Sequence, residues 1–222
     1  YVYWNQRMFQ LTGNSKYIDV LERTLYNGLI SGLSTNGKKF FYPNPLESDG
    51  KYNFNHGACT RSPWFDCSCC PTNLIRFIPS LPSLIYAQKD DTLYVNLYMS
   101  NKTKVKIQEQ IVELIQKTDY PNNGKISLEV NPEKNSRFTL LLRIPGWARN
   151  IVLPGSLYQY LGNLSLKPEL IVNRKKAEML LKNGYVCINR KWEKGDKIEI
   201  ILPFEVRKII SNKEVKENIN KV

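Results

Sequence analysis

No apolar run in this 222-residue sequence approaches the ~20 residues that cross a bilayer, and no signal peptide opens it. These absences argue against a membrane span but leave the cellular compartment open. The chain begins with Tyr1, inside a predicted helix, rather than with a methionine. We therefore expect an excised segment of a longer protein, with any signal peptide outside it. A bacterial periplasm and a cytoplasm both fit.

The sequence also lacks an even number of widely spaced cysteines. The chain has five cysteines, and Cys67, Cys69 and Cys70 fall close together. An odd count with two adjacent cysteines is unlike a small secreted disulfide scaffold, so reduced thiols or a metal site fit better. Cys59 adds another sulfur, although the spacing matches no common zinc-finger pattern. Cys187 lies in a predicted strand, where we expect it in the core.

Acidic residues are scarce, because 32 Lys and Arg against 20 Asp and Glu give a formal net charge of +12. A basic nucleic-acid binder with steeply salt-dependent binding is therefore one alternative. The lysines are scattered singly, however, apart from a cluster at residues 174–176, and no zinc-finger or RNA-binding signature accompanies them. We interpret the charge as a solvated lysine-rich surface and expect no nucleic-acid partner.

The first 35 residues predict two helices joined by a short turn. Trp4, Met8 and Leu11 repeat at helical spacing before Gly13 and Asn14 interrupt the pattern. Ser15 is placed to cap the second helix. The apolar stripe of that helix comprises Ile18, Leu21, Leu25 and Leu29. Two such faces need further partners to be buried, as in a helical bundle or barrel.

A long loop follows, over residues 35–66, in which Pro43 and Pro45 argue against a helix. A loop of this length in a compact domain is usually functional or flexible. It contains the single histidine, His56, which alone is weak evidence for a site. Glu47 and Asp66 are the carboxylates nearest the cysteines. Nothing in their spacing assigns either one a catalytic role.

The segment from Trp64 to Asn73 organises the chain, because a helix is predicted to start immediately after its cysteines. Pro71 suits the first helical position, and an apolar pattern follows. Cys69 and Cys70 would then lie at a helix N-terminus, where the dipole and free N–H groups favour a thiolate. A reactive or metal-binding pair and a pair of inert buried thiols are equally open at this point.

From about residue 90, apolar and polar residues alternate in short runs separated by turns, which is typical of an antiparallel β-sandwich. The predicted strands are residues 93–99, 126–130, 138–144, 185–189 and 198–202. The fold class is thus α+β. We divide the chain into a helical part at 1–89, a sandwich at 90–211 and a polar tail at 212–222.

The stretch Arg61-Ser62-Pro63-Trp64-Phe65-Asp66-Cys67-Ser68-Cys69-Cys70-Pro71-Thr72-Asn73 closely resembles glycoside hydrolase family 127 and its sister family 146, the β-L-arabinofuranosidase-type enzymes. Nearly the whole chain shares in the likeness. Residues 17–27 resemble a helix of the family's (α/α)6 barrel, residues 40–47 its active-site loop, and residues 142–148 and 190–196 its β-sandwich. The double-cysteine motif is the most specific part.

The resemblance implies a retaining glycosidase that removes terminal L-arabinofuranosyl units from an arabinose-containing oligosaccharide or glycan. It assigns Cys69 as the nucleophile and both Cys69 and Cys70 as zinc ligands. Tyr42 matches a residue that contacts the sugar. Trp64, like Tyr42 and Phe65, is an aromatic that could stack on a sugar face, although such aromatics are more often packing residues.

The family's other two zinc ligands, a glutamate and a cysteine, and its acid/base glutamate belong to segments before the first residue of this chain. The resemblance therefore implies the end of an incomplete barrel followed by the sandwich. We expect this chain alone to be inactive, and its exposed barrel faces to favour self-association. The alternative is a non-catalytic carbohydrate-binding or structural sandwich module whose cysteines are structural.

Overall fold

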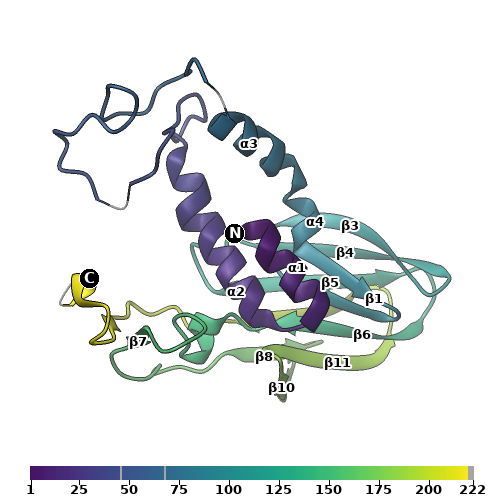
Figure 1. Cartoon of the computed structure of the whole chain (residues 1–222). Coiled ribbons are helices and arrows are strands. Elements are labelled where there is room, and N and C mark those ends of the chain that lie inside the picture. Colours follow the sequence, from purple (N-terminus) through teal and green to yellow (C-terminus); the bar gives the residue numbers. More distant parts are fainter. Residues whose placement is uncertain (46, 68, 220–222) are drawn as a thin grey trace.

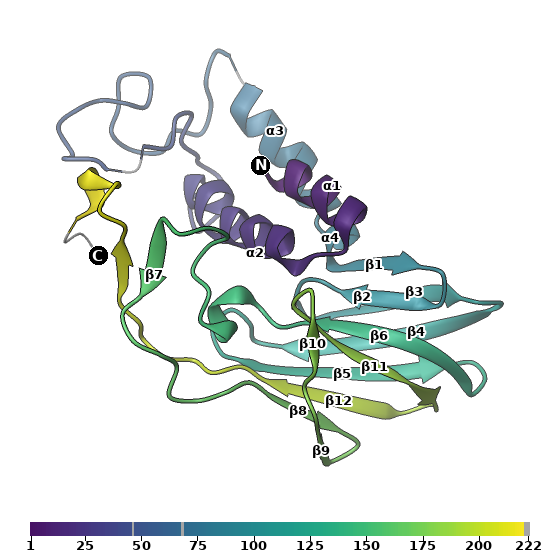
Figure 2. The same cartoon turned by 60° about the horizontal axis from the view of Figure 1, so that its bottom comes forward.

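A computed structural model describes residues 1–45, 47–67 and 69–219, in which the chain forms three layers (Figure 1). Helices lie on the outer face of a five-stranded sheet, whose inner face packs on a six-stranded sheet. Figure 2 shows the strands of the two sheets with the helices above them. The α+β class is therefore confirmed. Among the described residues, none of the helices has the length and apolar character to cross a bilayer.

The N-terminal helices form the expected hairpin. Helix α1 is Val2–Thr12 and α2 is Ser15–Arg23; α2 continues as the π-helical η1 (Thr24–Leu29) and the 3-10 turn η2 (Ile30–Gly32). After the long loop come α3 (Cys69–Phe77), η3 (Ile78–Ser80) and α4 (Pro82–Ile85). The breaks in this second helical stretch coincide with Pro79 and Pro82, because proline lacks the backbone N–H that a helix needs.

Two details of the helical hairpin differ from prediction. Trp4 and Leu11 are 69% and 80% exposed, and α1 buries Val2 and Phe9 instead. The exposed set and the buried set both have helical spacing. The second set is buried because α1 packs on the neighbouring sheet, where Phe9 contacts Tyr94. The cap of α2 is also one residue earlier, because the Asn14 side chain accepts a hydrogen bond from the Lys16 N–H.

The remaining elements are mostly strands. They are β1 (Tyr86–Lys89), β2 (Thr92–Val95), β3 (Asn101–Ile107), β4 (Gln110–Thr118), β5 (Lys125–Pro132), β6 (Ser136–Arg143), β7 (Tyr158–Tyr160), β8 (Glu169–Val172), β9 (Lys175–Ala177), β10 (Leu181–Lys182), β11 (Tyr185–Trp192), β12 (Asp196–Ile201) and β13 (Ile209–Ser211). Short 3-10 turns are η4 (Gly146–Arg149) and η5 (Lys216–Asn218).

The five-stranded sheet has the order β1-β2-β6-β11-β10 and the six-stranded sheet β3-β4-β5-β12-β8-β9, while β13 and β7 form a separate ribbon. Pairing is antiparallel except between β2 and β6, which are parallel. The sheet begins at Tyr86, four residues before the expected start of the sandwich at residue 90. The end of the predicted tail, residues 220–222, and Leu46 and Ser68 of the two motifs lie outside the described residues.

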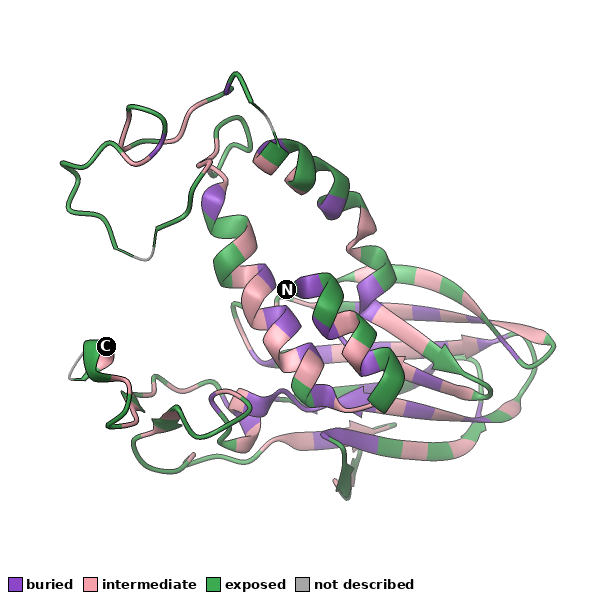
Figure 3. Ribbon diagram, viewed as in Figure 1, coloured by how far each residue is buried: buried purple, intermediate pink, exposed green. Residues whose placement is uncertain are grey.

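The sandwich core follows the predicted alternation. Its buried residues include Leu128 and Val130 from one sheet and Leu140 and Leu142 from the other. Figure 3 shows buried positions on the strands and on the inward side of α2, whereas the loop before α3 is largely exposed. Cys187 was expected in the core, but it is exposed on β11. The alternation of that strand is correct, but Cys187 belongs to its outward-facing set.

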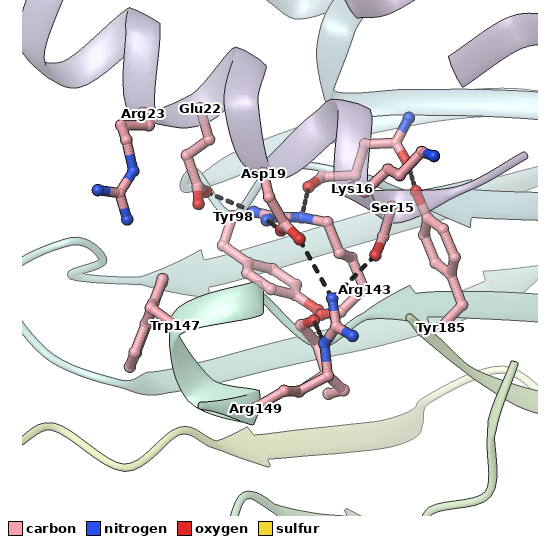
Figure 4. Close-up of polar contacts among 12 residues, drawn as sticks. Ser15, Lys16, Asp19, Glu22, Arg23, Tyr98, Arg143, Trp147, Arg149 and Tyr185 are labelled. Atoms are coloured by element: carbon pink, nitrogen blue, oxygen red, sulfur yellow. Dashed lines mark hydrogen bonds and ion pairs between the residues drawn. The ribbon is translucent and has the colours of Figure 1, made fainter. Parts of the chain in front are cut away.

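The helices are joined to the sandwich by a buried cationic side chain, Arg143 of β6, which is 0% exposed (Figure 4). Its guanidinium donates to Asp19 at 2.7 Å, to Glu22 at 2.5 Å and to the Asn96 carbonyl at 2.5 Å. Burial opposes its charge, but the two carboxylates outweigh burial and hold the Arg143 pKa well above its usual value. The ion pairs therefore fix α2 on the sheet.

We predict that Arg143→Met lowers the free energy of unfolding by about 3–5 kcal/mol, because it leaves the buried Glu22 carboxylate without its partner and leaves Asp19 with Arg149 alone. Urea denaturation followed by circular dichroism measures this. Lys102→Met is the matched control, since Lys102 is exposed and pairs with Glu113 on the surface. The control should cost less than about 1 kcal/mol. Equal losses in both variants would contradict a structural role for the buried pairs.

Candidate active site at the cysteine cluster

The cysteine pair lies in the first turn of α3, as the sequence predicts, but the helix begins earlier than expected. Cys69 is already helical, so Pro71 is the third helical residue rather than the first. The predicted apolar face is also narrower, since Pro71 and Phe77 are buried whereas Ile75 is exposed. The first turn of a helix carries free N–H groups and the positive end of its dipole. Both thiols therefore lie where a negative charge is favoured.

Tyr42 contacts the first cysteine of the pair directly. Its hydroxyl lies 2.8 Å from the Cys69 Sγ and 3.9 Å from the Cys67 Sγ. The hydrogen bond that Tyr42 donates lowers the pKa of the Cys69 thiol, and the neighbouring Cys70 thiol lowers it further. Burial, in contrast, raises the pKa of Cys70. Of the two adjacent thiols, Cys69 is thus the better nucleophile.

The loop that carries Tyr42 is held by two polar residues to which the sequence assigned no role. Asn55, 1% exposed, accepts from the Tyr42 N–H at 2.7 Å and donates to the Thr60 carbonyl at 2.7 Å. Arg61 donates to the carbonyls of Ser31 and Gly32 at 2.7 and 3.1 Å. These carbonyls end the helix that starts as α2, so Arg61 caps it and anchors the loop.

The other sequence candidates are placed differently. The ring of His56 lies 4.5 Å from that of Tyr42 and 5.2 Å from that of Phe65, so the histidine packs against the tyrosine. Trp64 is 63% exposed, and no ring contact joins it to another aromatic of the described chain. Glu47 and Asp66 are exposed. In the described part, no carboxyl group contacts the Cys69 thiol.

A cleft of about 350 Å³ opens beside the cysteine cluster. Its wall includes Tyr42, Asn44, Cys70 and Asn73, together with Thr24 of η1. Asn44 is fixed by hydrogen bonds from its amide to Ser31 Oγ and the Gly28 carbonyl. The cleft lies within the size range of small-molecule pockets and presents amide, hydroxyl and aromatic groups, which suit a sugar ring.

The cysteine pair also has the geometry of half a zinc site. The two Sγ atoms are 3.9 Å apart. Two thiolates bound to one zinc at ~2.3 Å in a tetrahedron are separated by about 3.8 Å, so Cys69 and Cys70 fit two of four ligands. Across residues 1–45, 47–67 and 69–219, no three His, Cys, Asp or Glu side chains converge on one metal position. Cys59 and Cys67 therefore do not complete the set there.

Known proteins resemble the chain over nearly its full length. A non-reducing end β-L-arabinofuranosidase of Bifidobacterium longum subsp. longum is 31% identical, over 98% of this chain and 32% of that protein. A solved GH127 β-arabinofuranosidase is 50% identical with a TM-score of 0.90, over 98% of this chain and 33% of the other. A GH127 β-L-arabinofuranosidase from Geobacillus stearothermophilus T6 is 38% identical with a TM-score of 0.83, and the two coverages are 98% and 32%.

The chain thus spans about a third of the length of these relatives. Two family models match this chain, each over a different part of it. The profile described as the β-L-arabinofuranosidase GH127 catalytic domain matches residues 1–83, and that of the GH127 middle domain matches residues 92–204. The resemblance read from the double-cysteine motif is confirmed. The chain belongs to the GH127 β-L-arabinofuranosidase family.

Proposed function

We propose that the protein containing this chain is a retaining glycosidase that removes terminal L-arabinofuranosyl units, with Cys69 as its nucleophile. The observation that carries the proposal is the 2.8 Å contact between the Tyr42 hydroxyl and the Cys69 Sγ. It joins a polarised thiol to an aromatic hydroxyl beside a sugar-sized cleft. Membership of the GH127 family supports the same substrate class.

In the first step of this mechanism, the Cys69 thiolate attacks the anomeric carbon and the bond to the leaving oxygen breaks. The leaving oxygen takes a proton from a general acid that the described residues do not supply. Water then attacks the same carbon and gives its proton to the group that acted as the acid, while the carbon–sulfur bond breaks and Cys69 regains its thiolate. Two displacements at one carbon retain its configuration. Tyr42 stabilises the thiolate before attack and as it departs.

Cys69 and Cys70 would hold a zinc ion, whose charge keeps sulfur ligands deprotonated at neutral pH. Their sulfur separation and their position in the first turn of α3 support this assignment. We expect the two remaining ligands, and the general acid, to come from other parts of the complete polypeptide. The 222-residue chain alone should therefore have no arabinofuranosidase activity.

The first test is turnover of a nitrophenyl L-arabinofuranoside by the complete polypeptide. We expect Cys69→Ser to lower kcat by about 10³-fold or more, because the serine hydroxyl is a far weaker nucleophile than a thiolate. Cys187→Ser is the matched control and should be unaffected. Wild-type kcat in the Cys69→Ser variant would refute the nucleophile assignment, and an inverted product in the NMR spectrum would refute retention.

A second test probes the thiol in the 222-residue chain without turnover. Because the hydrogen bond from Tyr42 lowers the pKa of Cys69, its thiolate fraction at pH 7 exceeds that of an ordinary cysteine. Tyr42→Phe should raise the pKa of Cys69 toward that of an ordinary cysteine. Alkylation of Cys69 by iodoacetamide, measured by peptide mass spectrometry, should then be severalfold slower. Cys187 serves as the internal reference, and exposed Tyr52→Phe as the control. Unchanged Cys69 alkylation would remove Tyr42 from the mechanism.

The third test is the zinc content of the purified 222-residue chain, measured by elemental mass spectrometry. We expect far less than one zinc per chain, because a structural site usually needs four ligands and only the Cys69–Cys70 pair has the required spacing. The complete polypeptide should hold one, and Cys70→Ser should reduce it. One zinc per isolated chain would mean that local groups complete the site, contrary to our proposal.

A further inference from the structure

A hollow larger than the cleft at the cysteines lies where α2 meets the sandwich. This junction cleft has a volume of about 800 Å³ and runs along α2 and η1 on one side and η4 and the following loop on the other. Its lining includes Asp19, Arg23, Tyr26, Asn27, Tyr120 and Trp147. In Figure 4, Arg23 lies on the same side of the view as Trp147, whereas the Glu22 carboxylate is directed to Arg143.

Three aromatic rings form one connected wall of the junction cleft. Tyr26 contacts Tyr120 with ring centroids 6.4 Å apart, and Tyr120 stacks on Trp147 at 6.4 Å and 19°. The Trp147 indole N–H donates to the Tyr120 hydroxyl at 3.2 Å, which fixes the orientation of the wall. Aromatic side chains of this kind bind the C–H faces of sugar rings as well as other apolar surfaces.

Polar groups beside this wall are free to bind a ligand. In the described chain, the Tyr26 hydroxyl and the Asn27 side-chain carbonyl have no hydrogen-bond partner. Arg23 uses a single N–H, toward the Val152 carbonyl at 2.8 Å. Together these side chains supply both hydrogen-bond donors and acceptors. A sugar needs both, because each of its hydroxyls can donate and accept. The paired carboxylates of Asp19 and Glu22 are by contrast already bound to arginines.

The backbone adds an independent indication. Tyr26 and Asn27 lie within η1, where the helix changes from α to π over Thr24–Leu29. A π-helical turn within an α-helix is rare, and such turns occur frequently at functional sites. Asn27 donates to the Arg23 carbonyl at 2.9 Å, so its amide N–H group supports this turn while its oxygen remains available.

From these observations we infer that the junction cleft is a second carbohydrate-binding site, which takes a neutral sugar unit against Trp147 with its hydroxyls toward Arg23, Tyr26 and Asn27. The choice of an arabinose-containing ligand rests on the proposed function. Figure 1 shows the loop before α3, and the start of α3, at the far end of the helix that begins as α2. The two sites would therefore engage different units of a glycan.

The test uses the 222-residue chain labelled with fluorotryptophan, whose four tryptophans give separate ¹⁹F resonances. Trp147 is identified by Trp147→Phe, and fully buried Trp192 reports whether the fold is intact. We expect titration with methyl β-L-arabinofuranoside or an arabinofuranose disaccharide to shift the Trp147 resonance. Tyr26→Phe should weaken the binding by about fivefold, through one lost hydrogen bond, whereas Tyr52→Phe should not.

No shift of Trp147 with either sugar, in a chain whose Trp192 signal is native, would overturn the inference. An equal shift with sodium sulfate would also overturn it, because the cleft would then be an anion site formed by Arg23 and Lys16. The proposed function is tested by a different measurement: if it fails, the complete polypeptide does not hydrolyse the nitrophenyl L-arabinofuranoside. Cys69→Ser should leave the Trp147 response unchanged, since that response does not depend on turnover.

Discussion

The buried charge of Arg143 is the constraint on which the rest of the structure depends. A guanidinium in the core must be neutralised, and both carboxylates that neutralise it, Asp19 and Glu22, come from α2. These ion pairs thereby fix the position and orientation of α2 on the sheet. Arg149 adds a second bond to Asp19 and one to Ser15, at the start of the same helix.

A series of contacts connects the helix that Arg143 holds to the cysteines. The helix that begins as α2 ends at η2, where its carbonyls accept both hydrogen bonds from Arg61. Arg61 belongs to the loop that leads into α3, and Asn55 of the same loop fixes the backbone of Tyr42. Tyr42 in turn contacts Cys69. A loop with little regular structure thus places a hydroxyl beside a thiol because both of its ends rest on rigid elements.

The parts of this arrangement that sequence reveals are the local ones. Alternation predicts β5, β6, β11 and β12 because each has one buried face, and prolines mark the breaks after α3. The pairing of Arg143 with Asp19 joins residues 124 positions apart, and no local pattern encodes it. The same limit applies to Trp4 and Leu11, since helical spacing defines a face but not the surface that covers it. The position of Cys69 at the start of α3 follows from local pattern, whereas the role proposed for it rests on the family motif.

One helix therefore serves two surfaces of different chemistry. Its sandwich end exposes Arg23, Tyr26 and Asn27 to the junction cleft, and its other end holds the loop of the cysteine cluster. The π-helical turn η1 contributes to both: Tyr26 and Asn27 line the junction cleft, and Thr24 and Gly28 line the cleft beside Cys70. The two clefts are therefore both lined by residues of a single helical turn, which lies outside the sandwich core.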